Sequence, residues 1–450
     1  MDRKFNALFD AVEQEKDRIL TAERHLWKHP ESGYREWKTH AYMVAQFEEL
    51  GYAVTHAGNI PGFYVDVDTG RPGPKLGIFA EMDSLIVPTH PECDPETGAV
   101  HACGHHCQCA AMLGIAAALR APGALDGLSG SIRLMVVPAE ELIEIGYRNQ
   151  LQKEGIIRYL GGKQEFMARG ILDGVDLAIM VHTNNRSGIT CNAGSNGCIT
   201  KEIVITGKSA HAGGSPQNGV NALYAANCAL NAANALRETF PDGDHIRFHP
   251  IITSGGHAVN SIPDRVCLES YVRGAGMEAI ARENRKLNQA FAGSAAAMGC
   301  GIHIHDQHGY APRFTDRVLK EIFREVGSRL VPEGKLEFTE VWSGGCSDMG
   351  DICQVMPGIH PYAGGAVGHS HGDDYFIVDP YLACVVSAKL QVGVAAQLLW
   401  QDGAEARRVV ENAGSHPTIP EYLASVDKNC FDGDAVTYRE DGSILLTFTN

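Results

Sequence analysis

The chain lacks an excess of positive charge. Its 450 residues carry 38 Lys and Arg against 54 Asp and Glu, which gives a formal net charge of −16 at pH 7. A protein that binds nucleic acid or an anionic membrane needs a basic surface to neutralise phosphates. We therefore expect neither nucleic acid nor a membrane among its partners.

Long hydrophobic runs and an even cysteine framework are also missing. The first twenty residues interleave charged with apolar side chains, so we expect no signal peptide, and no run of about 18 apolar residues predicts a spanning helix. The 13 cysteines are odd in number and scattered, which is more typical of reduced thiols than of disulfides. These features predict a cytoplasmic protein, and we find no internal repeat.

Hydrophobic residues make up 44% of the chain, and the length allows two to four domains. Three short apolar runs, at 75–81, 131–138 and 175–181, are typical of strands buried on both faces of a mostly parallel sheet. An Ala-rich helical pattern at 107–120 separates the first two runs, and another helix is expected over 4–28. This alternation predicts an α/β domain in which helices flank the sheet.

A different order of elements follows from 197 to 310. The pattern reads strand, helix, strand, strand, helix, strand, at 201–206, 220–239, 246–253, 265–273, 277–298 and 301–305. This is the split βαβ order of a ferredoxin-like α+β module. We therefore expect a first domain made of 1–196 and 311–400, an inserted module at 197–310, and a charged extension at 401–450 whose fold and role the sequence leaves open.

Polar, titratable residues follow each apolar run and precede the helix. They are Glu81, Asp83, Glu140, Glu141 and His182 after the runs, and Cys103 and His105 before the helix. The carboxyl ends of parallel strands line the ligand crevice of an open α/β sheet, so these side chains should converge. Thiolate, imidazole and carboxylate groups in one place are typical of a metal site.

Each of these residues has a simpler interpretation when taken alone. A strand-end carboxylate is more often a solvated cap, and Cys103 alone would more often be a small buried hydrophobe. Cys107 and Cys109 are two apart on the predicted helix and point to different faces, so we interpret both as packing residues. The joint occurrence of several ligand types at three strand ends favours the metal site.

Seven motifs in order give the chain a specific resemblance. They are EMD at 81–83, HACGH at 101–105, PAEE at 138–141, the strand-end His182, GKSAHAG at 207–213, NSIPD at 260–264 and HGDDYF at 371–376. Over about residues 15–400 the chain resembles the M20 metallopeptidases. It looks most like the amidohydrolase branch that contains N-acyl-amino-acid, auxin-conjugate and aminobenzoyl-glutamate hydrolases.

The resemblance implies two divalent metal ions per subunit, Mn²⁺ or Zn²⁺ first and Co²⁺ or Ni²⁺ as alternatives. It implies as their ligands Cys103, His105, Glu141, His182 and His371. It further implies that Glu140 is the general base for a metal-bound hydroxide. Asp83 is placed to orient an imidazole ligand.

The resemblance also assigns residues of the inserted module. His211 is similar to the residue that reaches the tetrahedral oxyanion, commonly from the partner subunit. Asn260 and Arg273 are similar to a pair that grips the substrate carboxylate, for which the two-pronged Arg is suited. The module would then act as a lid and as the contact of a homodimer.

The expected activity is hydrolysis of the amide bond of an N-acyl or aryl-acyl amino acid. A dipeptidase or carboxypeptidase of the same superfamily, and a non-catalytic metal-binding relative, remain alternatives. The chain departs from the family pattern at Glu81 and His106, where Asp is usual, and in the extra segment 143–166. This segment either reshapes the specificity or decorates the surface, and we favour the second interpretation. His369 is the alternative to His371.

Overall fold

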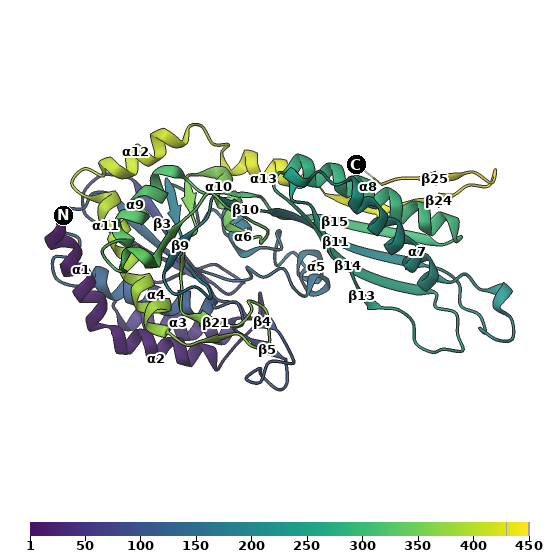
Figure 1. Ribbon diagram of the computed structural model, residues 1–450, viewed down its shortest axis with the longest axis horizontal. Coiled ribbons are helices and arrows are strands. Elements are labelled where there is room, and N and C mark those ends of the chain that lie inside the picture. The colour runs from purple at the N-terminus through teal and green to yellow at the C-terminus, as the bar shows by residue number, and fades with distance from the viewer. Residues whose placement is uncertain (429, 449–450) are drawn as a thin grey trace. The chain divides into compact units, whose positions relative to one another are not determined.

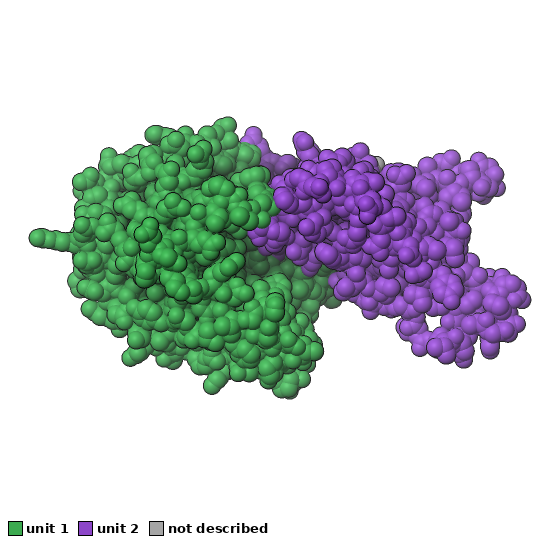
Figure 2. Space-filling view, in the orientation of Figure 1, with its two compact units in different colours: residues 1–194, 314–342, 347–419 green, residues 195–313, 343–346, 420–450 purple. Residues whose placement is uncertain are grey.

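The computed structural model describes residues 1–428 and 430–448 and divides the chain into two compact units (Figure 2). Unit 1 comprises 1–194, 314–342 and 347–419, and unit 2 comprises 195–313, 343–346 and the chain from 420 on. The segment 401–450 is not a part of its own. Its first 19 residues, 401–419, belong to unit 1, and its later described residues belong to unit 2.

A six-stranded sheet forms the centre of unit 1, in the order β1-β2-β6-β3-β7-β19. The strands are β1 (Thr55–His56), β2 (Phe63–Asp68), β3 (Lys75–Glu81), β6 (Ser131–Val137), β7 (Leu177–Ile179) and β19 (Gly358–Ile359). Strand β3 runs parallel to β6 and β7, β7 runs parallel to β19, and the β1–β2 edge is antiparallel. The sheet is thus mostly parallel, and β3 and β6 are buried after their first residue.

Helices surround this sheet (Figure 1). They are α1 (Asp2–Gln14), α2 (Lys16–Trp27), α3 (Trp37–Glu49), α4 (His105–Arg120), α5 (Ile145–Lys153), α6 (Gly162–Ala168), α9 (Arg317–Gly327), α10 (Met349–Val355), α11 (Ser387–Leu399) and α12 (Ala404–Ala413). Helix α4 is buried along its whole length except Arg120 and contacts α1, α2 and α11. The single helix predicted over 4–28 is wrong, because the chain breaks at Glu15 and lays α1 and α2 separately against α4.

Among the described residues one helical stretch, Tyr381–Leu399, is long and apolar enough to cross a membrane by length and composition. It begins with a π-helical turn, η5 (Tyr381–Val386), and continues as α11. In the structure 89% of its most apolar window is buried, and α11 packs against α1, α4 and α9. It is therefore a core helix of unit 1.

Short strands complete unit 1. A four-stranded sheet has the order β17-β9-β20-β8, and two strand pairs lie outside it. The strands are β4 (Leu85–Ile86), β5 (Ala99–Val100), β8 (His182–Thr183), β9 (Ile189–Cys191), β17 (Leu336–Phe338), β20 (Tyr362–Ala363), β21 (Ala366–Val367) and β22 (Phe376–Ile377). Where the chain passes between units it forms β10 (Gly194–Ser195), β16 (Arg313–Phe314) and β18 (Trp342–Ser343).

Unit 2 is an antiparallel sheet with two long helices on one face (Figure 1). Its elements are β11 (Gly197–Thr206), α7 (Ala222–Ala235), β12 (Arg247–Phe248), β13 (Ile251–Ser254), β14 (Arg265–Gly274), α8 (Met277–Ala297), β15 (Gly301–Tyr310), α13 (Ile419–Asp427), β23 (Phe431–Asp434), β24 (Val436–Tyr438) and β25 (Ile444–Leu446). The order β13-β14-β11-β15 is the ferredoxin-like order, and β23 extends the sheet beside β15. Small residues allow α7 to lie close to the sheet, and Asn221 caps it by accepting bonds from the next turn.

Candidate metal centre

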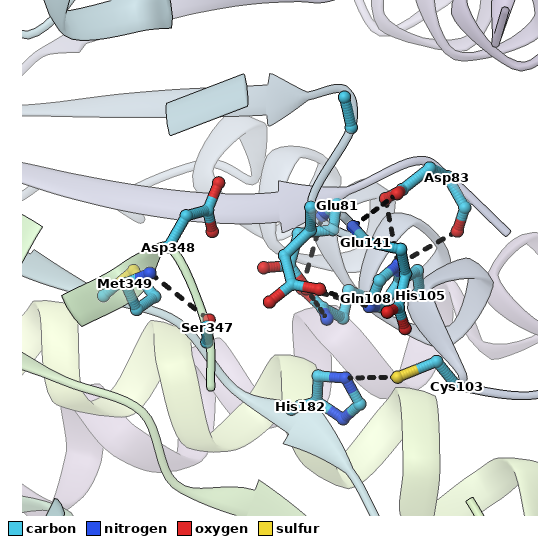
Figure 3. Close-up of polar contacts among 12 residues, drawn as sticks. Glu81, Asp83, Cys103, His105, Gln108, Glu141, His182, Ser347, Asp348 and Met349 are labelled. Carbon is cyan, nitrogen blue, oxygen red and sulfur yellow. Dashed lines mark hydrogen bonds and ion pairs between the residues drawn. The ribbon is translucent and has the colours of Figure 1, made fainter. Parts of the chain in front are cut away.

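Two strand ends of the unit 1 sheet deliver carboxylates to one place (Figure 3). Strand β3 ends at Glu81, and β6 ends at Val137, just before the Glu140–Glu141 pair. Ala139 adopts a left-handed backbone conformation, with φ of 57°, and its N–H donates to Oε1 of the buried Glu36 at 2.8 Å. In a strand, successive side chains point to opposite faces of the sheet. Because the chain turns at Ala139, Glu140 and Glu141 do not follow this alternation, and they contact different partners.

The five predicted ligands gather into two groups that share Cys103. Cys103, His105 and His182 have donor atoms within 4.8 Å of one another, and so do Cys103, Glu141 and His371. The Cys103 Sγ lies 3.5 Å from His182 Nε2 (Figure 3), and His371 Nε2 lies 3.2 Å from Glu141 Oε1. A thiolate common to two groups is the arrangement that holds two ions side by side.

Asp83 fixes the orientation of His105. The His105 Nδ1 lies 2.9 Å from the Asp83 carbonyl oxygen and 3.1 Å from its Oδ1, while Oδ2 accepts the Glu141 N–H at 2.8 Å. The Nδ1 therefore carries the proton, and the buried Nε2 makes no hydrogen bond among the described residues. An imidazole held by a carboxylate at one nitrogen, whose other nitrogen faces Glu81 Oε2 at 3.2 Å without a regular hydrogen bond, fits a metal ligand.

We expect Asp83→Asn to weaken metal binding about 10- to 100-fold. The carboxylate accepts from both His105 and the Glu141 backbone, whereas the single oxygen of an amide serves one of them well. Titration against a chelator of known affinity measures the change. Asp68→Asn is the matched control, because that exposed side chain accepts only from Gly70 N–H and an Asn retains this bond. Equal affinity in the two variants would contradict the role of Asp83.

Neighbouring charges hold the thiol and the carboxyl group of the predicted ligand set in their metal-binding forms. Burial and Glu141 raise the pKa of Cys103, but His105 and His182 outweigh them and lower it to about 6. Burial also raises the pKa of Glu141, yet His371 brings it down to about 2, while Glu141 raises the pKa of His371 to about 11. The thiol and the carboxyl group thus favour the ionised states that bind cations.

Glu140 lies outside the two groups that share Cys103 and instead forms a further ligand-type group with Glu81 and His105. Its side chain is buried, and Oε2 is 3.8 Å from His105 Nε2. Burial and the charges of Glu81 and Glu141 raise the pKa of Glu140 well above its usual value. A carboxylate that binds a proton readily beside the ligands is suited to general base work.

A buried lysine at this edge was not predicted from the sequence. Lys163 Nζ forms ion pairs with Glu81 and Asp348, all three side chains being fully buried, and its backbone N–H donates to Asp348 Oδ2 at 3.0 Å. Gln108 donates to the other oxygen of Glu81 at 2.6 Å. Glu81 Oε2 also lies 3.2 Å from His105 Nε2, so Lys163, Gln108 and His105 all contact this carboxylate.

The expectation that 143–166 decorates the surface is wrong for its buried residues. Lys163 is fully buried, and Arg148, 1% exposed, donates to the carbonyl oxygens of Glu141 and Leu160. A signal was present in the Gly–Gly pair before Lys163. A Cβ at Gly162 would lie 1.7 Å from the Pro138 carbonyl oxygen, so only glycine lets this segment approach the turn before Glu140.

The unit 2 candidates separate into two places. His211 and Asn260 are exposed neighbours, because His211 pairs with Ser261 and Ala212 N–H donates to the Asn260 carbonyl oxygen at 2.9 Å. The His211 Nδ1 accepts from the Gly213 and Gly214 backbones, which leaves the proton on Nε2. Arg273 lies eight residues along β14 from Arg265, roughly 27 Å at about 3.4 Å per residue. The structure thus does not bring Asn260 and Arg273 of one chain together.

His369, the alternative to His371, lies outside the site. Its side chain is 88% exposed and pairs with Asp374, with Nδ1 2.8 Å from the carboxylate. His371 instead adopts a left-handed backbone conformation, with φ of 67°, and its N–H donates to the Ala102 carbonyl oxygen at 3.0 Å. This contact ties His371 to the HACGH segment that carries Cys103.

Comparison with known proteins bears on this geometry. Residues 77–395 match the model of peptidase family M20/M25/M40. The chain belongs to this family. The M20 chain is 28% identical over 366 residues to Xaa-Arg dipeptidase of Mus musculus, covering 78% of each. It is 27% identical over 337 residues to indole-3-acetyl-aspartic acid hydrolase of Enterobacter agglomerans, covering 62% of this chain and 72% of that one.

Solved structures share its fold. A dinuclear metal-binding peptidase of the M20 family from Bacillus subtilis superposes with a TM-score of 0.62 at 20% identity, covering 86% of this chain and 99% of that one. The α/β unit and the ferredoxin-like unit predicted from the sequence are thus confirmed. Family membership, the hydrolase relatives and the ligand groups make the M20 chain a metallo-hydrolase that acts on amide bonds.

Proposed function

We propose that this M20 protein hydrolyses the amide bond between an acyl group and an amino acid with a free carboxylate, using two divalent metal ions. The observation that supports this most directly is the convergence of five ligand-type side chains around a shared Cys103, with the buried Glu140 beside them. Ligation alone does not need Glu140. Its presence favours catalysis over the non-catalytic alternative.

The residues divide the work as follows. Cys103 is shared, His105 and His182 lie on one side of it, and Glu141 and His371 lie on the other. The bound ions would polarise the scissile carbonyl and acidify a water molecule. Glu140 accepts the proton of the attacking water and returns it to the leaving amine. The mixed sulfur, nitrogen and oxygen donors suit Zn²⁺ or Mn²⁺ and also accept Co²⁺ or Ni²⁺.

Two substrate classes differ in one group. An N-acyl amino acid has no free amino group on its acyl side, whereas a dipeptide has one. The Enterobacter agglomerans relative supports the first class, which we favour, and the Mus musculus relative supports the second. The test compares propionyl- and alanyl-amino acids, which differ only in that amino group, with Asp, Glu, Cys and Arg as the amino acid. A higher kcat/KM for the propionyl series supports the acyl class, and the reverse supports a dipeptidase.

We further propose that His211 and Asn260 act in the site of a second copy of the chain, in a homodimer formed through unit 2. The support is that both are exposed and lie together, while Arg273 of the same chain lies at the other end of β14. Light scattering measures the oligomeric state. A monomer that hydrolyses substrate at the full rate would contradict this arrangement.

His211→Ala should then lower kcat about a hundredfold, because the protonated Nε2 is a donor for the oxyanion of the tetrahedral intermediate. The metal content should not change, since His211 lies in unit 2 and the ligands lie in unit 1. Steady-state kinetics and metal analysis check both statements. His257→Ala, which removes another exposed histidine of unit 2, is the control. Unchanged turnover would remove His211 from the mechanism.

A further inference from the structure

A separate cluster of ligand-type side chains lies in the helical layer of unit 1. It joins Glu23 of α2 with His106 and Cys107 of α4, all at most 3% exposed. His106 Nε2 lies 3.2 Å from Glu23 Oε1 and 3.5 Å from Cys107 Sγ, and the donor atoms of these three residues all lie within 4.8 Å of one another. The catalytic residues make none of these contacts.

The donor atoms have the spacing of a metal site. Tetrahedral zinc with bonds of about 2.0 Å to nitrogen and oxygen and about 2.3 Å to sulfur separates nitrogen from oxygen by about 3.3 Å and nitrogen from sulfur by about 3.6 Å. In the cluster, His106 Nε2 lies 3.2 Å from the Glu23 oxygen and 3.5 Å from the Cys107 sulfur. The Glu141–His371 and Cys103–His182 pairs of the catalytic centre show the same two values.

Hydrogen bonds alone leave this cluster poorly satisfied. His106 Nε2 faces both the Glu23 carboxylate and the Cys107 sulfur and carries at most one proton, so it cannot donate to both. His106 Nδ1 and both ring nitrogens of the buried His101, whose ring centroid is 4.9 Å away, have no hydrogen-bond partner among the described residues. A cation between the donors would satisfy Nε2, the carboxylate and the sulfur together.

We propose that Glu23, His106 and Cys107 bind a third divalent metal ion of the zinc type. Binding deprotonates Cys107, whose proton passes to solvent. Arg24, 2.9 Å from the same Glu23 oxygen, keeps that carboxylate ionised and oriented. The ion links α2 to α4, against which η5 packs, so its role is structural. Because the donors are buried, the ion enters as the chain folds.

The first test counts metal. Protein expressed and purified with zinc should contain three equivalents per chain, and Cys107→Ser should contain two and lose thermal stability. Cys109→Ser is the matched control, because its thiol is equally buried two residues further along α4 but bonds to the Glu81 carbonyl oxygen. It should retain three equivalents. Two equivalents in the wild-type protein would overturn the proposal.

A spectroscopic test does not depend on the stability of Cys107→Ser. Cys103→Ser removes the only cysteine of the two catalytic ligand groups. When this variant is refolded with Co²⁺, a thiolate-to-cobalt charge-transfer band should remain, and Glu23→Gln or His106→Asn added to Cys103→Ser should abolish it. If the Cys103→Ser protein shows no such band, Cys107 binds no metal. If the band survives in both double variants, it comes from another cysteine and the proposal fails.

Discussion

Glu140→Gln is expected to lower kcat about 10²- to 10⁴-fold and to leave the metal content unchanged. The amide is nearly isosteric with the carboxylate, but it cannot accept the proton of the attacking water. Glu140 lies outside the two groups that share Cys103, so the ligands remain in place without it. Its buried position, 3.8 Å from His105 Nε2, leaves no bulk water to replace it as a base.

The control is Glu144→Gln, four residues further along. Glu144 accepts from Ser32 at 2.6 Å and pairs with Arg35, and it contacts none of the metal ligands. This variant should turn over at nearly the wild-type rate. Steady-state kinetics on the better substrate series, combined with metal analysis, separates the outcomes. Loss of metal in Glu140→Gln would make Glu140 a ligand, and full turnover would end its assignment as the base.

The parts of the fold that could be predicted are those fixed by local pattern. The apolar run at 75–81 coincides with β3, and the predicted helix at 277–298 differs from α8 by one residue. A buried parallel strand appears in the sequence as a continuous run of apolar residues, and an amphipathic helix appears as apolar residues repeated with a period of 3.6. Each element can therefore be recognised from its own segment of the sequence. The convergence of Glu81, Asp83, Glu140, Glu141 and His182 could be predicted because strand ends meet at one edge of the sheet, whereas His371 was assigned only through the family resemblance.

No local sequence pattern indicates the ion pairs of Lys163. Lys163 is 82 residues from Glu81 and 185 residues from Asp348 in the sequence, and no periodicity connects positions so far apart. A lysine in an inserted segment is more often exposed than buried, which favoured the surface interpretation. Only the packing of α6 beside the turn after β6 brings it to the metal centre.

The misplaced pair in unit 2 has a different physical cause. Asn260 and Arg273 were assigned together by resemblance, and resemblance carries roles without saying which copy of the chain supplies each residue. The antiparallel register of β14 with β11 sets Arg265 opposite Thr206 and Arg273 opposite Cys198, at opposite ends of the same strand. The separation of Asn260 from Arg273 is therefore a consequence of topology.

Lys163→Met is expected to reduce the free energy of unfolding by about 3–5 kcal/mol. The variant keeps the aliphatic length but leaves Glu81 and Asp348 buried without their cation. Even with Lys163 present, burial raises the pKa of Asp348 to about 7. Denaturant unfolding measures the loss. Lys153→Met, at an exposed lysine of α5, should change stability by no more than about 0.5 kcal/mol.

The origin of this loss can be tested through charge and pH. Neutralising the partners in Lys163→Met/Glu81→Gln/Asp348→Asn should restore part of the stability, because amides cost less to bury than unpaired carboxylates. In the single variant both carboxyl groups would have pKa values above those of the unfolded chain, so acid protonates them in the folded state first. The stability deficit relative to wild type should therefore shrink as the pH falls. A deficit that stays constant with pH, or a triple variant no more stable than the single one, would mean that Lys163 contributes through packing and not through its charge.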